Sequence, residues 1–191
     1  SYTYQTAQIL DAEYCVFSHS GWGVHNTWDN NTRGAIPKYY KEICSLMPGP
    51  ENERLGGNQP HDFASWQPDF VVVNLGTNDA ASFDQPEWVD AQTGECYKMR
   101  RNADGSYNIE DIKTFQQAVK DFLDLIRECN PKAYIIWCYG MIGIPFQLYL
   151  CEAVSFYAHE TNDRFISYLQ LPDMTRESVG SREHPGFLCH Q

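Results

Sequence analysis

The sequence predicts an α/β fold, a three-layer α/β/α sandwich in which helices cover both faces of a parallel, flavodoxin-like sheet. Short apolar runs rich in β-branched residues alternate with longer segments in which apolar residues recur every three or four positions. Strands that alternate with helices in this way are typical of a parallel sheet. No repeat, low-complexity segment or internal boundary interrupts the 191 residues, so we expect a single domain over 1–191.

The clearest strand is the run over 70–75, in which five of six residues are apolar and three in succession are valine. Such a run is typical of a strand buried on both faces. Gly76 ends it, and Thr77-Asn78-Asp79 should then lie at the carboxyl end of the strand, where open α/β sheets bind ligands. The alternative is a plain strand-to-helix turn in which Asn78 or Asp79 is the N-cap.

The other elements follow the same alternation. The clearest helix covers 109–129, because Ile112, Phe115 and Val119 begin an apolar stripe and Asn130-Pro131 ends it. We expect further helices over 2–10, 36–46 and 145–159, and further strands over 13–18, 133–138 and 164–169. A long insertion over 80–108 contains a hairpin-type turn at 102–105 (Asn-Ala-Asp-Gly).

Composition excludes several classes of protein. The chain is 42% hydrophobic and 14% aromatic, which is typical of a folded core. A formal net charge of −11 disfavours nucleic acid as a partner, because that binding needs a cationic face. No apolar run is long enough to cross a bilayer, so we expect no membrane span. The cysteines lack the spacing of a zinc site, so we expect no metal. No glycine-rich phosphate loop follows a strand, which disfavours a nucleotide or flavin binder, and we expect no cofactor.

Seven cysteines favour an oxidised protein of the extracellular space or secretory pathway, with disulfide bonds. Residues 30–32 (Asn-Asn-Thr) form an N-glycosylation sequon, which agrees with a secreted glycoprotein. Because seven is odd, at least one thiol is free or bonds another chain. The alternative, that the cysteines are reduced and buried, stays open. No signal peptide begins at Ser1, which indicates a processed or truncated end.

Three short motifs lie far apart along the chain: 18–23 (Ser-His-Ser-Gly-Trp-Gly), 76–79 (Gly-Thr-Asn-Asp) and 184–186 (His-Pro-Gly). In this order they resemble the second, third and last blocks of the SGNH (GDSL-type) hydrolases. The run over 68–79 is most similar to the family-two carbohydrate (acetyl) esterases of that superfamily. The resemblance implies the SGNH hydrolase fold, with five strands in the order 2-1-3-4-5. The four strands predicted here match strands two to five.

The resemblance also implies roles for three residues. The Asn78 side chain and the Gly21 backbone N–H would donate to the oxyanion, and His184 would be the general base. The Gly-Asp-Ser block that carries the nucleophilic serine does not occur in this sequence. We therefore expect an N-terminally incomplete domain whose central first strand and serine come from a second chain or a cleaved N-terminal segment. Substitution by Ser18 or Ser20 is the weaker alternative.

The aspartate that orients the histidine in most SGNH enzymes is missing, because Ser181 and Arg182 occupy its places. Some family-two esterases are thought to use a serine–histidine dyad and a backbone carbonyl, so this loss does not exclude catalysis. We expect an SGNH-type carboxylic ester hydrolase that deacetylates a polysaccharide or glycoconjugate. The alternative is a non-catalytic structural or glycan-binding module of an extracellular assembly.

Overall fold

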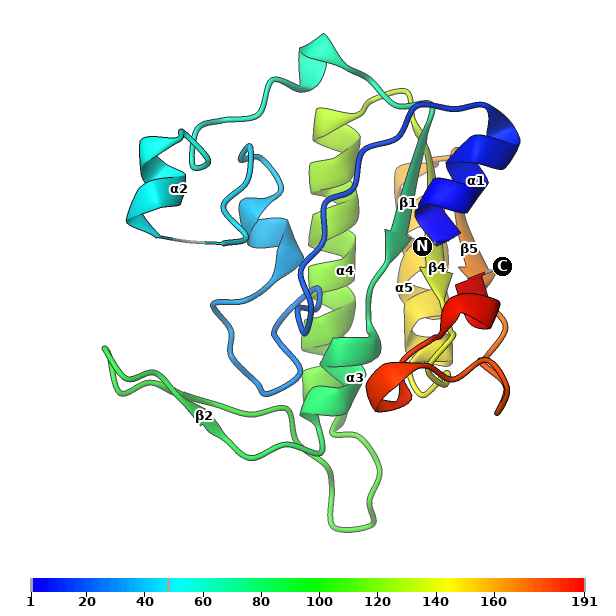
Figure 1. Cartoon of the computed structure of the whole chain (residues 1–191). Coiled ribbons are helices and arrows are strands. Elements are labelled where there is room, and N and C mark those ends of the chain that lie inside the picture. The colour runs from blue at the N-terminus through cyan, green and yellow to red at the C-terminus, as the bar shows by residue number, and fades with distance from the viewer. Residues whose placement is uncertain (1, 48, 191) are drawn as a thin grey trace.

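The computed structural model describes residues 2–47 and 49–190, and a parallel sheet of three strands lies at its centre. The strands are β1 (Phe70–Asn74), β4 (Tyr134–Tyr139) and β5 (Ile166–Gln170), in the spatial order β1-β4-β5. The helices α4 (Ile109–Cys129) and α5 (Gln147–Thr161) cover one face, and α1 (Tyr2–Leu10) lies on the other (Figure 1). The predicted α/β/α sandwich with a parallel sheet is confirmed.

Helix α4 supplies much of the core. It begins where Asn108 caps it, since the side-chain oxygen of Asn108 accepts from the N–H groups of Glu110 and Asp111. Its apolar stripe packs on the sheet, where the ring of Phe122 meets that of Trp137 in β4 at a centroid distance of 6.2 Å. The helix has the bounds that the apolar spacing predicts.

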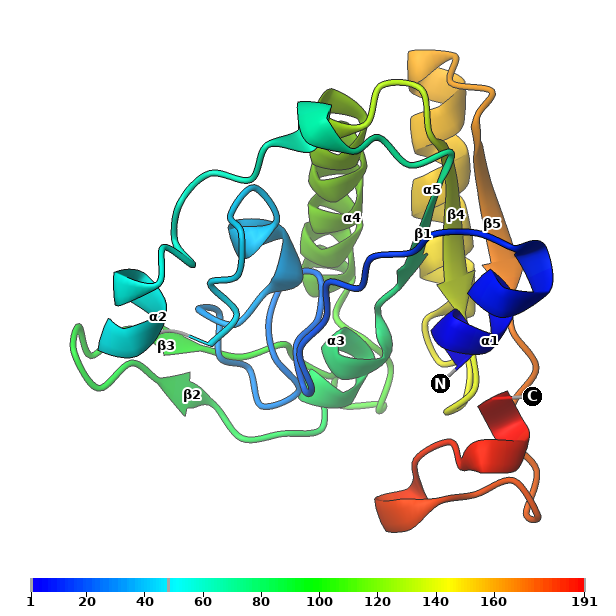
Figure 2. The same ribbon diagram turned by 45° about the horizontal axis from the view of Figure 1, so that its top comes forward.

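The shorter elements surround this core. Helices α2 (Pro50–Arg54) and α3 (Thr77–Ser82) flank β1 in the sequence, and the insertion contains the antiparallel pair β2 (Trp88–Val89) and β3 (Cys96–Tyr97) (Figure 2). The predicted turn at 102–105 is present, with the Gly105 N–H donating to Asn102 at 2.9 Å. Four 3-10 turns complete the described chain, at Ile36–Tyr39, Phe63–Ser65, Ser181–Glu183 and Phe187–His190.

The strand predicted over 13–18 is wrong as a strand. These residues are extended, but within the described chain their backbone groups pair with no strand. Strand β1 pairs with β4 on one side only, and Phe70 and Val72 in it are 62% and 55% exposed. In both views the segment after α1 runs past the free side of β1 (Figures 1 and 2). An extended segment becomes a β-strand only when its backbone hydrogen-bonds to an adjacent strand, and 13–18 lacks such a neighbour among the described residues.

The helix predicted over 36–46 is also wrong beyond its first turn, which is the 3-10 turn Ile36–Tyr39. The backbone beyond it pairs with a distant loop instead of continuing the helix. The N–H of Ile43 donates to Gln59 at 2.9 Å, and the N–H of Cys44 donates to Gly57 at 2.8 Å. A tertiary contact therefore overrides the helical spacing of the apolar residues.

The features expected of an oxidised, glycosylated protein are not supported. All seven cysteines have free thiols in this structure, so it gives no support to the expected disulfides. Cys129 and Cys138 are buried, and burial raises the pKa of the Cys138 thiol to about 11. Asn30 is fully buried, and its side-chain nitrogen donates to the carbonyls of Ser82 and Pro86. That nitrogen is therefore inaccessible to glycosylation in the folded chain.

The helices give no sign of a membrane segment. Within residues 2–47 and 49–190, none is both long enough and apolar enough to cross a bilayer.

We expect Leu123→Ala to lower the free energy of unfolding by about 2–5 kcal/mol, because this side chain of α4 is fully buried and its loss leaves a cavity. Leu148→Ala in α5 is the matched control; Leu148 is 73% exposed, so we expect a change within about 0.5 kcal/mol. Urea denaturation measures both. Equal losses in the two variants would contradict this placement of the core.

Candidate active site

The candidate site lies at the carboxyl end of β1, where the chain turns into α3. Gly76 makes this turn with φ of 121°, a backbone conformation that favours glycine. A Cβ at Gly76 would also lie 2.8 Å from a methyl carbon of Leu150. Asn78 and Asp79 consequently stand in the first turn of α3, directly beyond the sheet.

Asn78 and the loop that contains Gly21 are held together. The side-chain nitrogen of Asn78 donates to the carbonyl of Trp22 at 2.9 Å. Gly21 has φ of 79°, and its carbonyl accepts from the Trp28 N–H at 2.9 Å. Among the hydrogen bonds of the described residues, none uses the Gly21 N–H. Two potential oxyanion donors, a backbone N–H and a side-chain amide, therefore come from neighbouring segments.

Asp79 binds the same loop, although it was not among the predicted site residues. Its carboxylate is completely buried and accepts from the N–H groups of Val24 and His25, at 3.0 Å and 2.8 Å, and from Asn26 at a longer 3.5 Å. Burial raises the pKa of Asp79 to about 6, and the N–H donors oppose this rise. The N-cap of α3 is Gly76, without a side-chain bond, so the N-cap interpretation of Asn78 or Asp79 is wrong.

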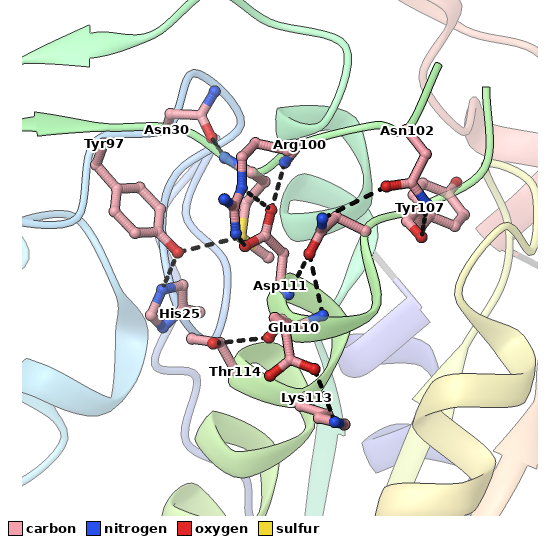
Figure 3. A network of polar contacts seen from close by, with 12 residues as sticks. His25, Asn30, Tyr97, Arg100, Asn102, Tyr107, Glu110, Asp111, Lys113 and Thr114 are labelled. Carbon is pink, nitrogen blue, oxygen red and sulfur yellow. Dashed lines mark hydrogen bonds and ion pairs between the residues drawn. The ribbon is translucent and has the colours of Figure 1, made fainter. Parts of the chain in front are cut away.

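The insertion over 80–108 supports the loop from the other side (Figure 3). The His25 side chain lies 2.7 Å from the Tyr97 hydroxyl, measured from Nε2, and this hydroxyl donates to the sulfur of Met99. The side-chain oxygen of Asn30 accepts from the Met99 N–H at 2.9 Å. Burial, with a further contribution from Lys38, lowers the pKa of His25, so its imidazole is neutral at pH 7.

His184 lies in the tail, directly after the 3-10 turn Ser181–Glu183. Its Nδ1 is 2.8 Å from the carbonyl oxygen of Arg182. Because a carbonyl only accepts, Nδ1 carries the proton and Nε2 is left with a lone pair, as a general base requires. Arg182 and Glu183 both have positive φ, 52° and 60°, which turns this carbonyl back toward the ring.

The structure brings Gly21 and Asn78 together and places His184 on a separate segment. The tail over 173–190 lies at the carboxyl end of the sheet, as α3 does (Figure 1). Within the described chain, no hydrogen bond joins His184 to Gly21 or Asn78. The convergence of all three residues on one substrate atom stays a prediction.

Sequence reasoning missed Asp79, His25 and Tyr97. The motif over 76–79 contains Asp79, but nothing in it says which amides the carboxylate binds. His25 and Tyr97 are 72 positions apart, and no local pattern links them.

We expect the buried Asp79 to make stability depend on pH. Its folded pKa of about 6 lies above the ordinary aspartate value of 3.8, so the folded state holds more protons between these two pH values. The contribution of this group is therefore greatest below pH 4 and is lost as pH rises through 6, by about 3 kcal/mol in the free energy of unfolding. Asp79→Asn should remove this dependence, measured by urea denaturation from pH 4 to 7.5.

The matched control is Asp84→Asn. Arg101 lowers the pKa of the exposed Asp84, so the stability that Asp84 contributes is lost as pH falls. Asp79→Asn and Asp84→Asn should thus change the pH profile in opposite directions. A profile that Asp79→Asn leaves unchanged would contradict the buried carboxylate.

Comparisons with known proteins identify solved structures that share this fold. No protein-family model matches the sequence, and no curated protein matches it. The solved structure of Est2A, an acetyl xylan esterase from the rumen bacterium Butyrivibrio proteoclasticus, matches with a TM-score of 0.97 and 45% identity, over 100% of this chain and 51% of that one.

Two family-two carbohydrate esterases share the fold at lower identity. The enzyme from Clostridium thermocellum has a TM-score of 0.68 and 24% identity, over 100% of this chain and 50% of its own. The enzyme from Cellvibrio japonicus has a TM-score of 0.71 and 18% identity, over 100% of this chain and 47% of its own. The chain is thus similar in structure to an acetyl xylan esterase and shares its fold with family-two carbohydrate esterases, and it spans about half the length of those it matches.

Proposed function

We propose that this chain, as one SGNH-like domain over 1–191, is part of a carbohydrate esterase that deacetylates a polysaccharide or glycoconjugate by serine-based acyl transfer. The observation that carries the proposal is the pairing of the Gly21 loop with Asn78 beyond β1, held by the 2.9 Å bond from Asn78 to Trp22. The likeness to Est2A, an acetyl xylan esterase, supports an acetylated carbohydrate as the substrate.

The proposed chemistry assigns one task to each residue. His184 Nε2 takes the proton of the nucleophilic serine as the serine oxygen attacks the acetyl carbon. It then gives that proton to the sugar oxygen, which leaves as a hydroxyl when its bond to the acetyl carbon breaks. Gly21 and Asn78 donate to the oxyanion of each tetrahedral intermediate, each contributing roughly 2.7–4 kcal/mol to transition-state stabilisation. His184 then takes a proton from a water molecule that attacks the acetyl-serine, and it returns this proton to the serine oxygen as acetate leaves. The Arg182 carbonyl takes the place of the missing aspartate as the group that orients His184.

We further propose that the serine arrives on a strand from a second chain or a cleaved N-terminal segment. The free edge of β1 and the unpaired extended segment over 13–18 support this, because one inserted strand would pair with both. A free strand edge presents a row of unpaired N–H and C=O groups, so it favours pairing with a partner strand. A polymeric substrate also favours an extracellular or secretory location.

A non-catalytic glycan-binding or structural module is the second candidate. It is favoured by one observation, the absence of a Gly-Asp-Ser block from these 191 residues. The two functions differ in a measurable way: an esterase assembly releases acetate from an acetylated xylan, whereas a module binds the glycan without turnover.

We expect His184→Ala to lower kcat for acetyl-ester hydrolysis by the complete natural assembly by at least about 10²-fold, because no other group would take the serine proton. His159→Ala is the matched control, since His159 lies exposed near the end of α5. Acetate release from acetylated xylan measures both variants. Full activity of His184→Ala would exclude this residue as the base.

We expect a fluorophosphonate probe, which reacts with activated serines, to label the complete assembly but not this chain on its own. The physical reason is that the side-chain hydroxyls of Ser18 and Ser20 make no hydrogen bond to a histidine ring nitrogen among the described residues; His19 Nδ1 contacts only the backbone carbonyl of Ser20. Peptide mass spectrometry locates the labelled serine. Labelling of Ser18 or Ser20 would place the nucleophile inside this chain.

A further inference from the structure

Asp79 is an unusual carboxylate, because it is completely buried and none of the ion pairs within the described chain involves it. Backbone N–H groups are its partners instead. Both oxygens accept from Val24, at 3.1 Å and 3.0 Å, and one also accepts from His25 at 2.8 Å. A buried charge is tolerated only where hydrogen bonds compensate its lost hydration, so these bonds keep the loop against α3.

The loop is shaped to receive this carboxylate. A Cβ at Gly23 would overlap the Oδ2 atom of Asp79 and crowd the carbonyl of Asn26, so position 23 requires glycine at this distance. The Gly23 N–H closes the loop by donating to Asn26 at 2.9 Å, and the Gly23 carbonyl accepts from the Ile36 N–H at 3.0 Å. The chain from 21 to 26 is thus a closed turn with the carboxylate packed against it.

Two consecutive side chains of α3 hold this turn at two points. Asn78 binds the carbonyl of Trp22, and Asp79 binds the N–H groups of Val24 and His25. We propose that Asp79 is a positioning residue that fixes the loop over 21–26, so that the Gly21 N–H and the Asn78 amide face the same oxyanion. This inference rests on the proposed esterase function, but the loop anchoring can be tested without it.

Other titratable groups lie near Asp79, and any test must distinguish their titration from that of Asp79. His25 lies on the bound loop, Tyr97 on β3 and Tyr139 on β4, and the charge of Asp79 acts on both tyrosines. His25 contacts the Tyr97 hydroxyl, as Figure 3 shows. Burial raises the pKa of both tyrosines, so neither titrates near neutral pH.

The first experiment uses the unaltered chain and NMR between pH 4 and 8. We expect the carboxyl carbon of Asp79 and the amide protons of Val24, His25 and Gly21 to titrate with one common midpoint. The ring signals of His25 separate its own titration. If the amide proton shifts of Val24 and His25 do not change with pH, Asp79 does not anchor the loop. If the Gly21 shift alone does not change, the anchoring does not reach the oxyanion site.

The second experiment compares Asp79→Asn with Asp84→Asn in the complete assembly. Asp84→Asn removes the same charge from an exposed ion pair with Arg101 and should leave kinetics unchanged. Asp79→Asn should lower kcat by about 10- to 100-fold with KM little changed, because the loop donors act on the transition state. Amide exchange should rise at Val24 and His25 in this variant, while β4 stays protected.

The outcomes separate the two proposals. If the unaltered assembly shows no turnover, the esterase proposal fails, while the NMR titration and amide exchange still decide the anchoring. If Asp79→Asn keeps full kcat, or exposes β4 as much as the loop, the positioning role is wrong. A rise in KM alone would also overturn it, because it would assign Asp79 to substrate binding.

Discussion

The parallel pairing of β1 with β4 is the constraint on which the rest of the structure depends. It aligns the carboxyl ends of the strands, and the turn at Gly76 then sends α3 away from that edge. Asn78 and Asp79 therefore face the loop over 21–26, although more than fifty residues separate the segments in sequence. A buried carboxylate whose partners are backbone N–H groups links α3 to this loop, and these hydrogen bonds offset part of the hydration that the carboxylate loses on burial.

The other edge of β1, opposite β4, is open in the described chain. The sheet is well packed on the side of α4, where Ile135 and Trp137 are fully buried. On the opposite face Phe70 and Val72 remain exposed, and the segment over 13–18 has no partner strand. An apolar strand with one free edge is a place where another strand can add.

In the proposed mechanism a backbone carbonyl, in place of a side-chain carboxylate, orients His184. The residue two positions earlier is arginine, yet its carbonyl oxygen lies 2.8 Å from Nδ1 of the imidazole. The positive φ angles of Arg182 and Glu183 bring it there. A carbonyl fixes the tautomer as a carboxylate would, but it adds no negative charge to stabilise an imidazolium.

Local patterns were enough for the elements whose periodicity is strong. The apolar stripe and the Asn130-Pro131 stop predicted the bounds of α4, and the valine run identified β1 and the motif that follows it. The segments over 13–18 and 36–46 were mispredicted because their conformation depends on backbone pairing with a distant segment. Within the described residues, the segment over 13–18 has no pairing strand, whereas residues 57–60 pair with the end of 36–46. Other contacts join residues more than fifty positions apart. Asp79 accepts from Val24 and His25, His25 contacts Tyr97, and the buried Asn30 donates to Ser82. Such contacts follow from how the segments pack together, and a pattern of neighbouring residues carries no record of that packing.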